Sequence, residues 1–165
     1  MAEDHRFCFI LDRLRSAHNT GNIFRIAEAV GASEIIACGY TPAPPHPKLA
    51  KTAMGTDKLV PCRVFQTAAA AIAAVRKEGY KMILAAEPGD EESFAWTREY
   101  DFPLAVIFGN EALGVSEEAL ELADGKVSLP MAGSKASINV GNAAAAIAYA
   151  IVSKTGTVFS KGDEK

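Results

Sequence analysis

The chain has 165 residues, of which 49% are hydrophobic and 22% charged, and its formal net charge is −3. This length suits one domain that buries roughly 70% of its unfolded surface, and the charge argues against coating nucleic acid by bulk attraction. No apolar run reaches the ~18 residues of a membrane span, and no signal-peptide pattern opens the chain, so we expect a cytoplasmic protein without a membrane partner.

The three cysteines are odd in number and widely spaced, at Cys8, Cys38 and Cys62. Each lies in or beside an apolar run, which predicts free buried thiols in a reducing compartment. The sequence has no CxxC pair and no Cys/His cluster, so we expect no structural metal site.

The first half of the chain alternates short apolar runs with helical patterns. Asn19 or Thr20 is the expected N-cap of the first helix, and Gly31 is its expected C-cap. Pro61 interrupts the third extended segment, which suits an edge strand. In chain order we predict a strand at 6–11, a helix from about 19 to 30, a strand at 33–38, a short helix at 48–54 and an extended segment at 59–65.

The second half continues the same alternation. In chain order we predict a helix at 67–78, a strand at 81–86, a long loop at 87–101, a strand at 104–108, a helix at 116–123, a strand at 126–129, a helix at 139–153 and a polar tail at about 154–165. The pattern predicts a single α/β domain over 1–165, with a mostly parallel sheet covered by helices on both faces. Ligands of such sheets bind beyond the carboxyl ends of the strands.

Gly109, Gly114 and Ser116 have nearly the spacing of a phosphate-binding loop after a buried strand. The lysine of such a loop is replaced by Val115, and Glu111 adds negative charge, so a nucleotide-binding α/β protein is disfavoured. No GxGxxG follows a predicted strand either. The stretch suits a neutral or cationic ligand, and the alternative is a plain turn.

Asn19, Asn22 and Arg25 recur every three residues and share the polar face of the first helix. Two amides beside a guanidinium are suited to clamping a phosphate or a ribose. The alternative is that Arg25 is a solvated charge or an ion-pair partner of Glu28.

The stretch 128–142 leaves a short apolar run, passes Pro130 and Gly133, and opens an alanine-rich helix. Its small residues and free backbone N–H groups favour close approach to a ligand. Ser137 and Asn139 are therefore candidate ligand contacts, and capping of the last helix explains them equally well.

Together these stretches resemble the SpoU/TrmH-type RNA 2′-O-ribose methyltransferases of the SPOUT superfamily. Residues 19–25 match its N-x-G-x-x-x-R motif, residues 109–114 match its second motif, and 129–133 with 137–140 match its third. Residues 51–55 also resemble a small-residue segment of the family. Gly141 departs from the serine that is usual at that position.

The resemblance implies an α/β fold whose C-terminal part forms a deep trefoil knot that holds S-adenosylmethionine. It also implies a homodimer with the site near the subunit interface. The implied cofactor contacts, many through backbone atoms, are Leu84, Ala85, Gly109, Asn110, Gly114, Leu129, Met131, Ser137 and Ile138.

The implied reaction needs an aligned ribose hydroxyl rather than a metal. Arginine is a poor base because it stays protonated, so Arg25 is expected to grip the adjacent phosphate and stabilise the developing alkoxide, close to the partner's cofactor. Asn19 is expected to orient Arg25, and Glu111 to shape the cofactor loop. Asn139 is expected to hold the substrate or the knot.

The resemblance implies a tRNA or an rRNA as substrate, and we expect no accessory RNA-binding domain within these 165 residues. We therefore expect core side chains to contact its phosphates, with an affinity that falls as salt rises. These candidates are Arg13, Arg15, Asn22, Lys48, Lys51 and Lys58. The alternative function is a non-catalytic RNA- or cofactor-binding module on the same fold.

Overall fold

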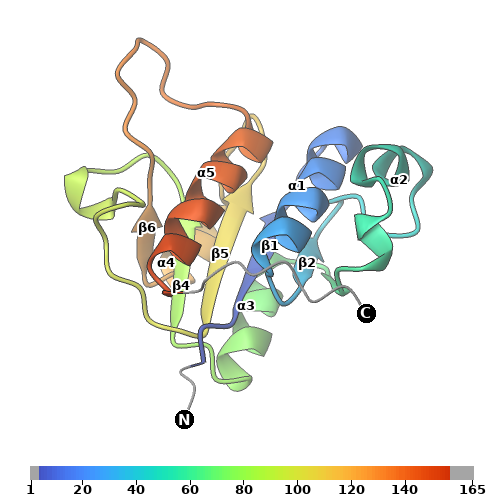
Figure 1. Ribbon diagram of the computed structural model, residues 1–165, viewed down its shortest axis with the longest axis horizontal. Coiled ribbons are helices and arrows are strands. Elements are labelled where there is room, and N and C mark those ends of the chain that lie inside the picture. The colour runs from blue at the N-terminus through green and yellow to red at the C-terminus, as the bar shows by residue number, and fades with distance from the viewer. Residues whose placement is uncertain (1–3, 157–165) are drawn as a thin grey trace.

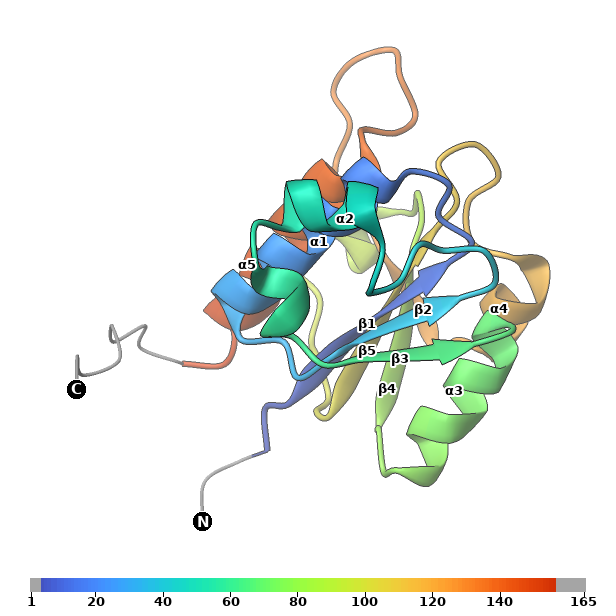
Figure 2. The same cartoon turned by 90° about the vertical axis from the view of Figure 1, so that its right-hand side faces the viewer.

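The computed structural model describes residues 4–156 and contains one six-stranded sheet. The strand order is β3-β2-β1-β5-β4-β6, and every pairing between neighbouring strands is parallel. Helices cover both faces of the sheet (Figures 1 and 2). The predicted α/β class with a mostly parallel sheet is confirmed.

The elements follow the predicted order with shifts of a few residues. The strands are β1 (Phe7–Asp12), β2 (Ile35–Cys38), β3 (Cys62–Phe65), β4 (Met82–Ala86), β5 (Leu104–Gly109) and β6 (Gly125–Val127). The helices are α1 (Ala17–Val30), α2 (Pro47–Ala53), α3 (Ala68–Lys77), α4 (Glu117–Leu122) and α5 (Val140–Ser153), with 3₁₀ turns η1 (Thr56–Lys58) and η2 (Glu91–Ser93). None of the helices within residues 4–156 is long and apolar enough to cross a membrane.

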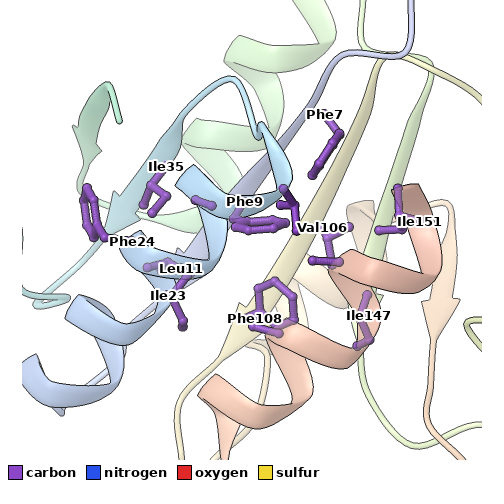
Figure 3. Packing of buried hydrophobic residues seen from close by; sticks show 14 of the residues in the cluster. Phe7, Phe9, Leu11, Ile23, Phe24, Ile35, Val106, Phe108, Ile147 and Ile151 are labelled. Carbon is purple, nitrogen blue, oxygen red and sulfur yellow. The ribbon is translucent and has the colours of Figure 1, made fainter. Parts of the chain in front are cut away.

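The larger core lies between the sheet and helices α1 and α5, which lie side by side (Figure 1). Figure 3 shows Phe9 and Phe108, from the central strands β1 and β5, gathered beneath these two helices. Their rings meet edge to face, with centroids 5.5 Å apart. Helix α1 follows β1 directly and so begins at the carboxyl ends of the strands, and a hydrogen bond between Asn19 and Asn139 places the start of α5 beside it.

The smaller core lies on the opposite face, under α3 and α4 (Figure 2). It contains Cys8 and Cys38, so the prediction of buried free thiols is confirmed for these two residues, whereas Cys62 is half-buried. Burial raises the pKa of Cys8 and of Cys38 to about 12. Both thiols therefore stay protonated at neutral pH and act as small apolar groups.

The start of α1 corrects the predicted helix cap. The helix begins at Ala17, and Ser16 is the N-cap because its side chain accepts a hydrogen bond from the backbone N–H of Asn19. The predicted C-cap at Gly31 is confirmed, with a left-handed φ of 73°. Most of the tail predicted at 154–165 lies outside the described residues.

Candidate functional site

A cavity of about 520 Å³ opens at the carboxyl ends of β4, β5 and β6. The three stretches singled out in the sequence all contribute to its wall. The wall consists of residues 86–88, 108–114, 127–129, 131 and 136–140, together with Asn19, Ala143 and Ile147. A volume of this size suits a small-molecule ligand, and the position is the one expected for a parallel sheet.

The loop between β5 and α4 forms one wall of the cavity, and Asn110 holds it together. The buried Asn110 side chain donates to the Arg13 carbonyl at 2.8 Å and to the Tyr40 hydroxyl at 3.0 Å. Its Oδ1 accepts from the N–H groups of Ala112 and Leu113 at 2.8 and 2.9 Å. The Asn110 amide is therefore committed to holding the loop in its turn.

Both glycines of this loop are needed sterically. A Cβ at Gly109 would lie 2.2 Å from the backbone of Gly114 and Val115, which is far inside contact distance. Gly114 has a φ of +72°, where L residues are strained, and a Cβ there would lie 2.6 Å from a Glu87 carboxylate oxygen. The spacing that resembled a phosphate loop therefore reflects a tight turn of the chain upon itself.

Glu111 ties this loop to the segment that precedes α1. Its carboxylate accepts from the N–H of Arg15 at 3.0 and 3.1 Å and from the N–H of Ser16 at 3.5 Å. The second motif stretch is thus joined, through this side chain, to the backbone just before the first motif stretch. The contact holds the loop against that segment, and the role of Glu111 toward a cofactor stays a prediction.

Arg13 belongs to the same junction. Its backbone is left-handed, with a φ of 58°, and its guanidinium bonds the Asp12 carboxylate at 3.2 Å and the Gly114 carbonyl at 3.3 Å. The Arg13 side chain is therefore directed into the loop and remains partly exposed, and its contact with RNA stays a prediction. Asp12 is buried and also accepts from the N–H of Ser116 at 2.8 Å.

Asp12 and Glu87 are two site residues that the sequence did not reveal. Both follow or end a buried strand, and both accept hydrogen bonds from the backbone around Val115: Asp12 from Ser116, and Glu87 from Val115 at 2.6 Å. The available signal was a carboxylate at the carboxyl end of a strand, where a parallel sheet places its ligands.

The first and third motif stretches meet at the start of α5. Asn139 caps this helix, accepting from the N–H groups of Gly141 and Asn142 at 2.8 and 3.2 Å. Its own amide donates to Asn19 Oδ1 at 3.1 Å. Asn139 therefore fills the predicted capping role while also lining the cavity. Asn19 is bonded to Asn139, and its role in orienting Arg25 stays a prediction.

Two glycines allow the helices around this junction to approach closely. A Cβ at Gly21 would lie 2.7 Å from the Leu49 carbonyl oxygen of α2, which explains the glycine of the first motif. A Cβ at Gly141 would lie 2.7 Å from Asn22 Nδ2 of α1. Glycine at 141, in place of the usual serine, leaves room for Asn22 beside the cap of α5.

The second wall of the cavity is the connection between β6 and α5. Leu129, Met131, Ser137 and Ile138, which are candidate cofactor contacts, line the cavity, and residues 130–138 are all exposed. Within the described part of the chain, these nine positions, 130–138, make no hydrogen bond. The connection projects away from the body of the molecule in Figure 1.

Leu84 and Ala85, two of the candidate cofactor contacts, do not line the cavity. Both are fully buried, Leu84 in the larger core and Ala85 in the smaller one. Successive residues of a central strand point to opposite faces of the sheet, so both side chains are used in packing. Ala86, Glu87 and Pro88, just beyond them, line the cavity instead.

Arg25 and the predicted RNA-contacting lysines lie outside this cavity. Arg25 is exposed on α1, six residues beyond Asn19 and so about 9 Å further along the helix axis. Lys48, Lys51 and Lys58 are exposed on α2 and η1, which pack on α1. The structure therefore brings together most of the candidate cofactor residues and separates them from the candidate substrate residues on α2 and η1.

With this geometry established, comparison with known proteins identifies the family. Residues 6–149 match the family model described as the SpoU rRNA Methylase family. The chain belongs to the SpoU rRNA methylase family. The predicted family resemblance is thus confirmed, and it covers most of the described residues.

Relatives of the SpoU chain include enzymes that modify different RNAs. It is 37% identical over 142 residues to the tRNA (guanosine(18)-2′-O)-methyltransferase of Thermus thermophilus, covering 85% of this chain and 71% of that protein. It is 35% identical over 150 residues to the 23S rRNA (uridine(2479)-2′-O)-methyltransferase of Streptomyces viridochromogenes, covering 87% of this chain and 51% of that protein.

The fold is also that of solved SpoU structures. The methyltransferase AviRb from Streptomyces viridochromogenes, solved in complex with AdoMet, superposes with a TM-score of 0.80 at 30% identity. The match covers 93% of this SpoU chain and 59% of AviRb. This chain therefore spans between half and three quarters of the relatives named here.

Proposed function

We propose that this SpoU chain transfers a methyl group from S-adenosylmethionine to a ribose 2′-hydroxyl of tRNA or rRNA. The observation that carries the proposal is that three motif stretches, far apart in sequence, line one cavity of about 520 Å³. The relatives named above methylate 2′-hydroxyls of a tRNA or an rRNA, in agreement with the predicted reaction. The proposed substrate is therefore an RNA of one of these two classes.

The residues of the cavity fit the cofactor. When bound, S-adenosylmethionine supplies an activated methyl group on a positively charged sulfur. Gly109 and Gly114 offer backbone without side chains, and Leu129 and Ile138 offer apolar surface from the opposite wall. Glu87 places a carboxylate in the same cavity. Close backbone approach, apolar flanks and negative charge together match an adenosine that carries a cation.

The core motif residues are proposed to act on the ribose. Arg25 grips the phosphate beside the target nucleotide and stabilises the alkoxide that develops on the ribose oxygen. An arginine cannot accept the proton, which leaves to the phosphate or to water. The pair Asn19 and Asn139 joins the substrate side of the site to the cofactor side through a 3.1 Å hydrogen bond.

A homodimer is proposed because one chain separates Arg25 from its own cavity. Arg25 is exposed and outside the cavity wall, so a second copy is the simplest way to bring it to a cofactor. The exposed basic residues Arg15, Lys48, Lys51 and Lys58 are proposed to hold the RNA phosphates. The Asn22 side chain lies beside Gly141 of α5, so we propose that Asn22 acts on the RNA through the position of that helix and not by touching it.

A trefoil knot is proposed from the path of the chain around β6. Helix α4 packs with α3 on one face of the sheet, whereas α5 packs with α1 on the other. Between them, β6 pairs with β4, and Ser128 is bonded on its other side to Ser93 and Ala95, each at 2.9 Å. Residues 125–128 thus lie between β4 and residues 93–95 where the chain crosses from one face of the sheet to the other. This path supports a knot in which residues 125–128 pass through the ring formed by β4, residues 87–103 and β5.

We also propose that residues 1–165 form one domain.

Methyl transfer from labelled S-adenosylmethionine to total tRNA and rRNA tests the proposal. We expect Arg25→Ala to lower kcat by about 100-fold or more while cofactor affinity, measured by calorimetry, changes little. Lys77→Ala on the opposite face removes the same charge and is expected to keep full activity. Near-normal turnover of Arg25→Ala would remove Arg25 from the mechanism. If the wild type binds both the cofactor and RNA but transfers no methyl group, the chain is the non-catalytic module instead.

A further inference from the structure

Glu87 follows β4 and contributes a carboxylate to the cavity wall. One oxygen, Oε1, accepts a hydrogen bond from the N–H of Val115 at 2.6 Å, which fixes the carboxylate against the turn at Gly114. The other oxygen, Oε2, makes no hydrogen bond within residues 4–156. Glu87 is therefore held in place by one oxygen and has the other available to a ligand.

The second carboxylate of the cavity wall is differently placed. Both oxygens of Glu111 accept hydrogen bonds from the N–H groups of Arg15 and Ser16. No lysine or arginine is among the described residues that line the cavity. The wall thus carries negative charge without a basic lining residue, and its uncommitted carboxylate oxygen belongs to Glu87.

We propose that Glu87 makes this cavity prefer the positively charged methyl donor over the neutral S-adenosylhomocysteine that remains after transfer. The inference rests on the proposed function. In the transfer, a carbon–oxygen bond forms at the ribose as the sulfur–carbon bond breaks, and the electron pair of that bond stays on sulfur. The hydroxyl proton leaves to phosphate or water. The ligand's sulfur loses its positive charge, so its attraction to Glu87 disappears and product release is favoured.

This role differs from a purely structural one in what it predicts. If Glu87 only supported the turn at Val115, its loss would weaken both ligands equally, because they share adenosine and the amino-acid group. If its charge acts on the ligand, the loss weakens the charged donor selectively. The ratio of the two affinities therefore separates the roles without relying on catalytic activity.

The test is calorimetric titration of wild type and Glu87→Gln with S-adenosylmethionine and with S-adenosylhomocysteine. Glutamine keeps an oxygen that can accept from Val115 and removes the charge. We expect affinity for the charged donor to fall about tenfold and affinity for the neutral product to change less than twofold. Sinefungin, which carries an ammonium near the position of the sulfonium, is expected to follow the donor. Glu117→Gln, in the first turn of α4 outside the cavity, is the charge-matched control and is expected to change neither.

The possible failures are distinct. Equal weakening of both ligands in Glu87→Gln would assign Glu87 to support of the turn and overturn the inference. Unchanged affinities would overturn it as well. Wild-type protein that binds neither ligand would instead overturn the proposed function. Thermal unfolding of each variant without ligand verifies that the compared proteins are folded.

Discussion

The two walls of the cavity differ in how they are held. The wall at residues 109–116 is bonded to its surroundings through Asn110, Glu111, Asp12 and Glu87, with distances between 2.6 and 3.5 Å. The wall at residues 130–138 is exposed throughout and makes no hydrogen bond within the described residues. One wall is thus part of the folded body, whereas the other is connected to it only at its ends.

This difference separates positioning from access. A wall fixed by buried hydrogen bonds has its backbone donors and acceptors in place before a ligand binds, which lowers the entropy lost on binding. A wall with few contacts opens at little cost and admits the ligand. In this chain the two tasks fall to different motifs: the second motif positions the ligand and the third leaves the entrance open.

The strongest test of the fixed wall is Gly109→Ala. The new Cβ would lie 2.2 Å from the backbone of Gly114 and Val115, and backbone atoms cannot move aside as a flexible side chain can. We expect the free energy of unfolding to fall by about 3 kcal/mol or more, measured by urea denaturation. A loss below about 1 kcal/mol would mean that the turn relaxes easily and that this wall is not rigid.

Asn110→Ala tests the hydrogen bonds of the same wall. The substitution removes the buried Asn110 amide and leaves the Arg13 carbonyl and the N–H groups of Ala112 and Leu113 without their part-buried hydrogen bonds. We expect a loss of about 2 kcal/mol in the free energy of unfolding and a weaker cofactor affinity, measured by denaturation and calorimetry. Asn142→Ala is the matched control, because Asn142 is exposed on α5 and its side chain is not in the cavity wall. Equal effects of the two variants would contradict the special role of Asn110.

Local patterns predicted the elements well, because their signals lie within a few residues. Thr67 caps α3 and Gly31 ends α1 as expected, and the broken extended segment with Pro61 leads into the edge strand β3. The sequence predicts the N-cap of α1 at Asn19 or Thr20 instead of Ser16, because all three residues have capping side chains. The apolar periodicity, which could have marked the start, begins only at Ile23. Several competing caps make a helix start ambiguous.

The composition of the cavity wall was less predictable, because it depends on contacts between distant residues. Glu87 acquires its role from Val115, 28 residues later, and Arg13 is drawn into the loop by Gly114, 101 residues away. The family resemblance implies cofactor contacts at Leu84 and Ala85, and the structure shows that both side chains are buried in the sheet. Motif spacing therefore locates a site to within a few residues and leaves side-chain direction to the tertiary packing.

The smallest effect is expected for Gly133→Ala, in the wall at residues 130–138. A Cβ at Gly133 meets nothing within 4 Å, and its φ lies outside the left-handed region. Alanine also lowers the conformational entropy of the unfolded chain, which stabilises the folded protein slightly. We therefore expect the free energy of unfolding to rise, by less than about 0.5 kcal/mol. Urea denaturation of this variant beside Gly109→Ala applies the same chemical change to both walls. A loss above about 1 kcal/mol at Gly133 would show that residues 130–138 are packed, because a methyl group without neighbours has nothing to displace.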